Sequence, residues 1–333
     1  MLTRVAASHI RVGTFQYFAA RGETDHLQQL ADYTIARHDP GLSGTPQPYL
    51  GLLRAVAERQ AMLIAQWMNV GFIHGVMNTD NMTLSGETID YGPCAFMETY
   101  DPATVFSSID QHGRYAYGNQ PNIARWNLAR LAETLLPLLS DDPEEAVAQA
   151  TAVIEAFPVQ YAAQRLRGQR AKLGLRRADG VDDMADAQLA QDWLSLLQAG
   201  QVDYTLAWRH LADMAAGEPA SLRAHFAEST ALEDWLARWR ARCAGEDGAA
   251  GPGLAAAGEQ RAQRMRRSNP WVIPRNHQVE AALSAASEHG ELGPFERLLD
   301  ALRRPYDPAV AQAAYAEPGT PAVTAGYRTF CGT

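Results

Sequence analysis

The residues best suited to chemistry gather between positions 71 and 92, where histidine, amide and carboxylate side chains follow one another closely. His74 and Asn81 are seven residues apart, Asp80 directly precedes Asn81, and Asp90 opens an Asp-Tyr-Gly tripeptide. Amide and carboxylate oxygens are the donors that hard divalent cations prefer. Phosphate transfer depends on charge neutralisation and positioning, and such a cation supplies both. The segment therefore indicates metal-assisted phosphate chemistry.

The spacing matches the protein-kinase pattern H-R-D-L-x-x-x-N followed by D-F-G, with one key residue changed. In that pattern the aspartate two residues after the histidine accepts the proton of the substrate hydroxyl. Val76 occupies this position here, and an apolar side chain cannot accept a proton. Asp80 is a carboxylate in a shifted position. The pattern therefore argues against ordinary phosphoryl transfer.

Three segments together resemble the SelO family of protein adenylyltransferases. They are Thr3 to Gly13, Gly71 to Pro93, and the later cluster of Asn269-Pro270-Trp271 and Arg275-Asn276-His277. Members of that family look like kinases, but they bind ATP in a flipped orientation and move AMP onto protein hydroxyl groups. The resemblance implies transfer of AMP from ATP to Ser, Thr or Tyr side chains, with Mg²⁺ or Mn²⁺ as cofactor.

The resemblance also implies a role for individual residues. Asp80 would accept the hydroxyl proton, and Asn81 and Asp90 would bind the metal ion that carries the nucleotide. Arg4 and Arg11 would hold the nucleotide phosphates, for which the planar guanidinium group is well suited. Taken singly, Asp-Asn and Asp-Tyr-Gly sequences are also common in turns. Their joint presence in register with the arginine motif favours the functional interpretation.

Apolar spacing predicts a mostly α-helical α+β protein. An amphipathic helix from Pro48 to Val70 would lead into the His74 loop. Two short β pieces, near Met82–Leu84 and Thr88–Ile89, would present Asp90 at a strand end, and residues 91–121 are typical of an activation-segment-like loop. Further helices are expected at Asn122–Leu139, Pro143–Arg170, Met184–Leu197, Tyr204–Met214, Ala231–Cys243, Glu259–Arg267, His277–Ala286 and Pro294–Leu302.

The resemblance implies a protein-kinase-like C-lobe with a helical C-terminal extension. A kinase-like fold carries a glycine-rich loop and a strand lysine ahead of its catalytic loop. Only 73 residues precede His74, and the single lysine of the chain, Lys172, follows it. We therefore expect the N-lobe to be largely absent. The predicted divisions are a C-lobe at 1–243, a flexible linker or insertion at 244–258, and a helical segment with a tail at 259–333.

Composition excludes several classes of function. The net charge of −9 argues against nucleic acid or anionic membrane as the main partner. No secretory signal is visible, and the longest apolar region, Ala61 to Met77, is too polar to span a membrane, so we expect a cytoplasmic protein. Three scattered cysteines do not form a disulfide framework or a zinc site.

Several other residues allow simpler interpretations. By analogy with kinases, we expect His74 to make structural hydrogen bonds rather than to act as a base. The basic stretch from Arg165 to Arg177 is typical of a solvated helix face. Trp67, Trp126 and Trp271 are expected in the core.

We also predict a redox latch between Cys94 and Cys331. Cys94 lies four residues after Asp90, and Cys331 is the third residue from the C-terminus. Members of the SelO family carry a cysteine or selenocysteine in that tail, which implies redox use. The simpler alternative is a pair of unrelated free thiols, as expected in a reducing cytoplasm.

Two other functions remain open. A small-molecule phosphotransferase is the first, because H-G-D-x-x-x-x-N with I-D-x-G also marks aminoglycoside-kinase-like proteins. Val76 counts against it, since those enzymes rely on the same missing aspartate. The second is a non-catalytic helical interaction module derived from a truncated enzyme.

Overall fold

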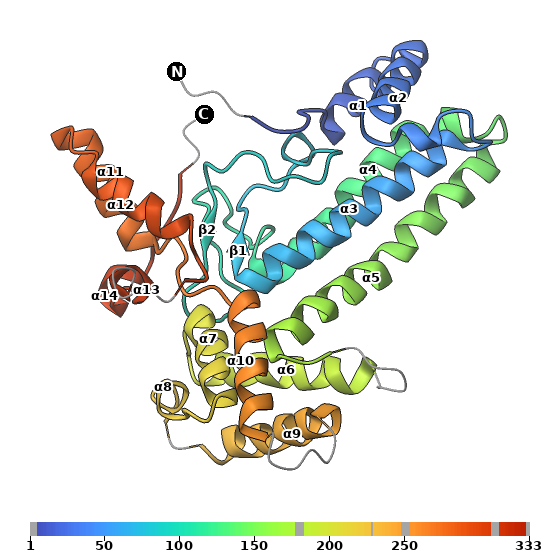
Figure 1. The fold of residues 1–333 in the computed structure, drawn as a ribbon. Helices are drawn as coiled ribbons and strands as arrows, with labels where there is room; N and C mark the ends of the chain where they lie inside the picture. Colours follow the sequence, from blue (N-terminus) through green and yellow to red (C-terminus); the bar gives the residue numbers. More distant parts are fainter. Residues whose placement is uncertain (1–4, 177–182, 228, 248–253, 308–312, 331–333) are drawn as a thin grey trace.

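The computed structural model describes residues 5–176, 183–227, 229–247, 254–307 and 313–330 (Figure 1). These residues form a mostly helical protein. Their one sheet is the antiparallel pair of strands β1 (Phe72–Ile73) and β2 (Ala95–Phe96). The mostly helical α+β class predicted from the sequence is confirmed. Within this described part, no helix combines the length and apolar character needed to cross a membrane.

Helix α3 (Pro48–Val70) leads the chain into the predicted site. It begins with a proline, whose missing N–H would have no partner in the first turn. Gly71 ends it with φ of 76°, and the Gly71 N–H donates to the carbonyl of Trp67. Apolar side chains such as Val56 recur at helical spacing and are fully buried. The predicted helix is confirmed at both ends.

Two more long helices, α4 (Gln120–Leu139) and α5 (Pro143–Leu173), pack along α3, and Figure 1 shows the three as one bundle. At the start of α5, the Asp142 side chain accepts a hydrogen bond from the Glu144 N–H, and Gly174 ends the helix with φ of 70°. Two shorter helices contact the upper end of the bundle, namely α1 (Val12–Ala19) and α2 (Thr24–His38).

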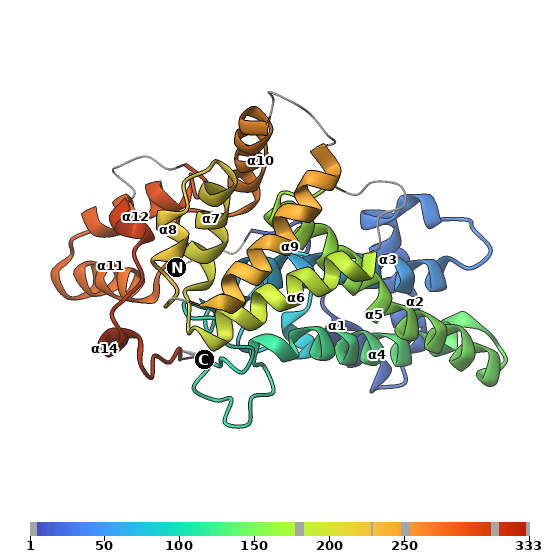
Figure 2. The ribbon, with the colours of Figure 1, turned by 90° about the horizontal axis from the view of Figure 1, so that it is seen from below.

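A second group of helices lies below the end of α5 in Figure 1, around four buried tryptophans. The ring centroids of Trp193 and Trp235 are 4.5 Å apart, Trp235 stacks on Trp239 at 6.1 Å, and Trp208 meets Trp193 edge-on. Figure 2 shows α6 and α9 side by side on the underside. The helices of this group are α6 (Asp183–Ala199), α7 (Tyr204–Ala215), α8 (Ala220–Arg223), α9 (Thr230–Asp247) and α10 (Leu254–Ser268).

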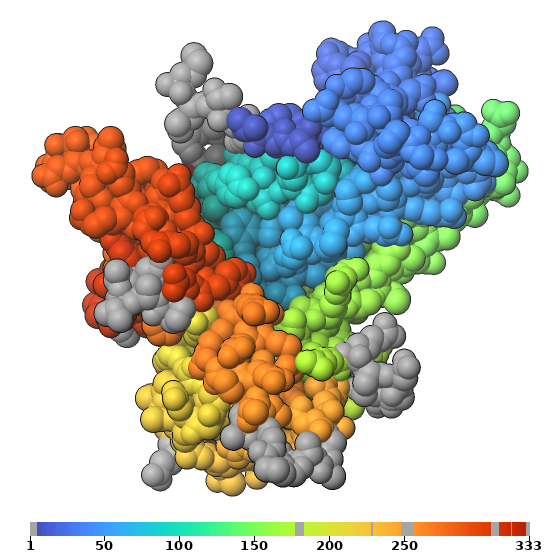
Figure 3. Space-filling model, in the orientation of Figure 1, coloured from blue at the N-terminus to red at the C-terminus, as the bar shows by residue number. Residues whose placement is uncertain are grey.

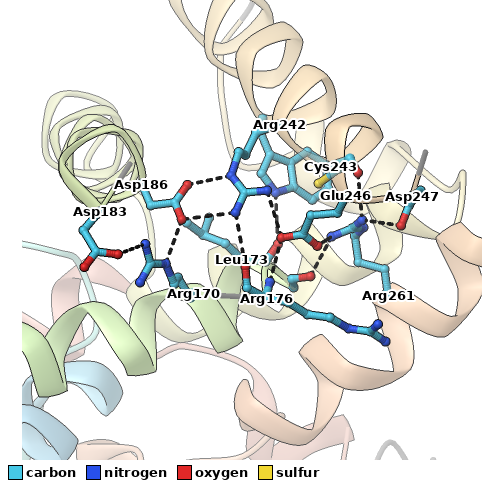
Figure 4. Close-up of polar contacts among 12 residues, drawn as sticks. Arg170, Leu173, Arg176, Asp183, Asp186, Arg242, Cys243, Glu246, Asp247 and Arg261 are labelled. Atoms are coloured by element: carbon cyan, nitrogen blue, oxygen red, sulfur yellow. Dashed lines mark hydrogen bonds and ion pairs between the residues drawn. The ribbon is translucent and has the colours of Figure 1, made fainter. Parts of the chain in front are cut away.

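A network of ion pairs joins these helices to α5 (Figure 4). Arg170 Nε and Arg242 Nε lie 2.7 and 2.8 Å from the two carboxylate oxygens of Asp186, which is only 1% exposed. Glu246 continues the network, because its oxygens contact Arg242 Nη1 at 2.9 Å and Arg261 Nη1 at 3.2 Å. The network therefore connects α5, α6, α9 and α10 through fixed charges.

The C-terminal helices form an arm beside this body, at the left of Figure 1. Arg275, at the start of the arm, is buried. Its Nη1 lies 2.5 Å from an oxygen of Asp203, at the start of α7, and its Nη2 donates to the Ala316 carbonyl. This buried pair ties the arm to the helical group. The helices of the arm are α11 (Asn276–His289), α12 (Gly293–Leu302), α13 (Ala313–Ala316) and α14 (Pro321–Thr324).

The expected helices after residue 120 are all present, while other elements differ from prediction. Helices α1 and α2 were not predicted. The two expected β pieces are not strands, because only single bridges form there, between Met82 and Thr88 and between Thr83 and Arg11. Both ends of the predicted linker are helical, since α9 continues to Asp247 and α10 begins at Leu254.

Two expectations about burial were wrong. Trp126 is 42% exposed, and the guanidinium groups of Arg114 and Arg130 lie about 5 Å from its ring centroid, so the ring packs against cations instead of the core. The basic stretch is not a fully solvated face, since Arg170 and Lys172 are 6% and 3% exposed. The neighbouring helices α6 and α7 cover that side of α5.

Candidate active site

His74 holds the loop together from within the core, where its side chain is fully buried. Its Nε2–H donates to the Ile89 carbonyl at 2.8 Å, and its backbone N–H donates to the Gln120 side chain. Burial lowers the pKa of His74, which favours the neutral ring that these contacts require. The predicted structural role is confirmed. Because Ile89 directly precedes Asp90, His74 links its own loop to the segment that carries Asp90.

The turn Thr79–Asn81 contains Asp80 and Asn81, two of the polar residues predicted for the site. The Asn78 side chain accepts a hydrogen bond from the Asp80 N–H and starts this turn. Asn81 Nδ2 donates to the Val76 carbonyl at 2.9 Å. This contact orients the amide so that its Oδ1 points away from Val76, as a hard-cation ligand requires. Val76 has an apolar side chain, but its backbone carbonyl thus holds the Asn81 side chain in place.

Asp90 follows the bridge between Met82 and Thr88 and has φ of 60°, in the left-handed region that aspartate tolerates better than most residues. No group of three His, Cys, Asp or Glu side chains within the described ranges could bind a metal ion by itself. The assignment of Asn81 and Asp90 as ligands therefore stays a prediction, and it would require a cation such as Mg²⁺, which keeps few protein ligands and takes the rest from water and phosphate oxygens.

The N-terminal segment lies directly against this turn. The Leu84 N–H donates to the Ile10 carbonyl at 3.0 Å, and the Val12 N–H donates to the Met82 carbonyl at 3.1 Å. This pairing places Arg11 beside the segment that follows the turn Thr79–Asn81, and Arg11 Nε is buried without a hydrogen-bond partner in the described residues.

Gly13, at the start of α1, contacts the Asp80 side chain. A Cβ atom at position 13 would lie only 2.0 Å from Asp80 Oδ1, so the carboxylate occupies the space that a side chain would need. The structure therefore brings Arg11, Asp80 and Asn81 together. The second predicted arginine, Arg4, lies outside the described residues, and its role stays a prediction.

The C-terminal tail packs on the loop that follows Asp90. Thr329 Oγ1 donates to the Pro93 carbonyl at 2.6 Å, and the Thr329 N–H donates to the Phe106 carbonyl. Cys94 is a partly buried free thiol, and burial raises its pKa to about 11. Cys331 lies outside the described residues, so the latch stays a prediction.

Two features of the site were missed by sequence reasoning. The Trp67 indole donates to Thr88 Oγ1 at 2.8 Å and lies against the His74 ring, so a residue expected only to fill the core also supports the site. At the end of α3, the hydroxyl groups of Tyr117 and Tyr204 both donate to the Met68 carbonyl. The periodicity of α3 predicted burial here, but it carried no signal for these long-range partners.

The residues of this site lie within the part of the chain that a known protein family matches. The model of the family described as "Protein adenylyltransferase SelO" matches residues 1–303. The chain belongs to the SelO family. A curated relative named "Protein nucleotidyltransferase YdiU" from Chromobacterium violaceum is 59% identical over the whole chain, and relatives of the same name from Rhizobium etli and Cereibacter sphaeroides are each 55% identical.

The chain spans about two thirds of the length of these relatives. All of its residues are matched, but they cover 67% of the Chromobacterium violaceum protein, 64% of the Rhizobium etli protein and 65% of the Cereibacter sphaeroides protein. The SelO match includes the N-terminal pairing segment, the loop from His74 to Asn81 and the helical group, and it ends just after α12.

Proposed function

We propose that this chain provides the metal and proton-acceptor loop of a protein adenylyltransferase, which transfers AMP from ATP to Ser, Thr or Tyr hydroxyl groups of proteins. The observation that supports the proposal is the pairing of residues 10–12 with residues 82–84, because it brings Arg11 close to the turn that carries Asp80 and Asn81. Membership of the SelO family supports the same reaction class and ATP as the substrate.

Each residue has a role that follows from its surroundings. Asp80 is exposed in the middle of its turn, where it can accept the proton of an incoming hydroxyl group. Asn81 and Asp90 would bind Mg²⁺ or Mn²⁺, which neutralises phosphate charge and helps the pyrophosphate leave. Arg11 would contact a phosphate oxygen through its guanidinium group.

The fold that we propose for this site is a kinase-like C-lobe. The order of elements supports it, since a long helix enters a buried histidine loop, an aspartate follows shortly before the second strand, and an irregular segment precedes the next long helix. The proposed divisions at residues 243 and 258 separate this lobe from the C-terminal helices.

The proposal is tested with ATP labelled on the α-phosphate or on the γ-phosphate. The assay uses this chain alone and this chain joined to the part of the Chromobacterium violaceum relative that it does not cover. Incorporation of the α-label alone into a protein acceptor is expected. Incorporation of the γ-label would instead favour a phosphotransferase, and loss of both labels in both proteins would favour the non-catalytic module.

Asn81→Ala and Asp90→Ala test the metal assignment within the same assay. We expect each change to reduce metal-dependent transfer roughly 100-fold or more, because a ligand of the cation is lost while the core is untouched. Melting temperature provides the control for folding. Transfer at the unchanged rate in either variant would remove that residue from the metal site.

A further inference from the structure

A cavity of about 730 Å³ lies beside the site, where the ends of α3 and α5 meet the start of the C-terminal arm. In Figure 3 the blue of α3, the green of α5 and the orange of α10 come together at the middle of the face shown. Aromatic side chains form much of the wall, among them Trp67, Phe72 and Tyr91. The volume falls within the range of small-molecule pockets, and the lining has their mixture of aromatic and polar groups.

Lys172, the single lysine of the chain, also lines this cavity and is only 3% exposed. Its Nζ lies 4.8 Å from the ring centroid of Trp208 and 5.5 Å from that of Tyr204. No described carboxylate forms an ion pair with it. Burial and the nearby charge of Arg165 both lower the pKa of Lys172 well below its usual value.

Two other polar atoms near the Lys172 amine are buried without a hydrogen-bond partner among the described residues. Arg165, the neighbouring cation, is surrounded by tyrosines, and its Nη1 is buried without a hydrogen-bond partner. Asn69, also on the cavity wall, has a buried Oδ1 without a partner. Buried cations in proteins are normally paired, since an unpaired charge is strongly destabilised away from water. The region therefore carries positive charge, or the capacity for it, that the described residues do not neutralise.

We propose that this cavity binds a small aromatic anion, with Lys172 as the partner of its negative charge and the aromatic wall as the contact surface for its ring. The ligand class is an aryl phosphate or a molecule with the same combination of ring and anionic group. The binding site lies behind Asp90, because Thr88, Tyr91 and Cys94 also line the cavity. The proposal does not depend on AMP transfer, since binding is measured without ATP.

Calorimetric titration with phenyl phosphate tests the charge partner. We expect Lys172→Met to weaken binding by roughly tenfold or more, because a charge-assisted contact is lost while the length of the side chain is kept. Ala171→Phe should block binding by filling the cavity with Lys172 intact. Arg167→Met is the matched control, since Arg167 is an exposed cation on the same helix that does not line the cavity, and it should bind as the wild type does.

Proton uptake gives a second readout from the same titration. Burial lowers the pKa of the Lys172 amine in the free protein, and pairing with an anion raises it, so binding takes up protons at pH values between the two pKa values. In that pH range, wild-type binding enthalpies should differ between buffers of different ionisation enthalpy, and this difference should disappear in Lys172→Met. The proposal is overturned if phenyl phosphate does not bind the wild type at millimolar concentration, or if Lys172→Met binds it equally well.

Chemical trapping locates the site directly. The Lys172 amine attacks the aldehyde of pyridoxal 5′-phosphate, water leaves to form an imine, and borohydride supplies the hydride that reduces it to a stable secondary amine. Peptide mapping should place the label on Lys172 in the folded protein, with protection by excess phenyl phosphate, while the labelled N-terminal amine serves as the unprotected control. Label on Lys172 only after unfolding in urea, or without protection, would contradict the proposal.

Discussion

At the scale of single residues, the site depends on Gly13, which has no side chain, as much as on its polar groups. The Asp80 carboxylate rests where a Cβ atom of residue 13 would lie, so glycine at that position allows the N-terminal segment to approach the proposed metal loop. The same approach places Arg11 beside Asn81 through the bridge to Thr83. Position 13 therefore controls where the proposed proton acceptor stands.

Gly13→Ala tests this control. The added methyl group must displace Asp80, and a displacement of about 1 Å can reduce a transfer rate roughly 100-fold. We expect that loss in the labelled-ATP assay, with a melting temperature close to that of the wild type. Gly41→Ala is the matched control, because nothing lies within 4 Å of a Cβ atom at that position. Equal rates in Gly13→Ala and Gly41→Ala would show that Asp80 does not need its present position.

The sequence predicted some residues of this site and not others, for a physical reason. The loop residues from His74 to Asn81 are local in sequence, and their spacing was sufficient to find them. The burial of Lys172 depends on Trp208, which comes from a helix thirty-six residues later, and a basic stretch viewed alone suggests a solvated surface. Contacts of this kind are set by tertiary packing, which composition and periodicity do not encode.

At the scale of elements, the C-terminal tail is part of the loop after Asp90. Tyr327 packs on Phe106, and Thr329 pairs with Ser107 and with the Pro93 carbonyl. Cys94 directly follows Pro93, and Cys331 stands two residues after Thr329. The predicted latch already joined this tail to this loop, but the contacts of Thr329 and Tyr327 were not visible in the sequence.

The redox latch is tested by mild oxidation followed by non-reducing mass spectrometry. We expect a cross-linked peptide that contains Cys94 and Cys331. A closed loop of this length would stabilise the fold by about 5 kcal/mol on the chain-entropy estimate. Cys243, the third cysteine, is the internal control, because it is buried in α9 and should stay reduced. Two free thiols at 94 and 331 after oxidation would contradict the latch.

A pair of histidines joins α7 to the turn that follows α8. His210 Nδ1 and His225 Nε2 are 2.7 Å apart and their rings stack, which requires that at least one ring is neutral. Burial is the main cause that lowers the pKa of both. His225 and Arg209 lower the pKa of His210 further, while Asp213 and Asp203 oppose the shift. Asp203 also opposes the shift of His225. The unfolded chain therefore binds more protons than the folded one below about pH 6.5, the usual pKa of histidine.

This difference predicts how stability depends on pH. The contribution of the pair is complete above about pH 6.5 and is lost as the pH falls toward the lowered pKa values. Melting temperatures between pH 7.5 and 5.5 should therefore decrease, and they should decrease less in His225→Gln. Burial also lowers the pKa of His74, so part of the pH dependence of the melting temperature should remain in both proteins. An identical pH slope in the variant would show that the pair does not titrate in this range.

At the scale of the whole molecule, α5 is the element shared by the two groups of helices. It packs on α3 and α4 along its length, while Arg170 near its end contacts Asp186 and Asp183 of α6. Helical periodicity predicted the lengths of these helices well. It did not predict which of them meet, because the charged residues of the network come from four separate segments.

Asp186→Asn tests the coupling between the groups. Asp186 is almost fully buried between two arginines, and removing one partner of a buried pair typically costs about 3–5 kcal/mol. We expect a loss of that size in urea unfolding. Glu133→Gln is the control, since its pair with Arg130 is exposed and should contribute under about 1 kcal/mol. Similar small effects in both variants would show that the network does not stabilise the joint.

The tryptophan stack has a consequence for spectroscopy. Four of the seven indoles lie in contact in the helical group, and closely stacked rings couple electronically. Near-ultraviolet circular dichroism and intrinsic fluorescence of this protein therefore describe mainly the packing around Trp193 and Trp235. A signal from the site must come from Trp67, whose indole is bonded to Thr88, and a single-tryptophan variant that keeps it would report optically on the metal loop alone.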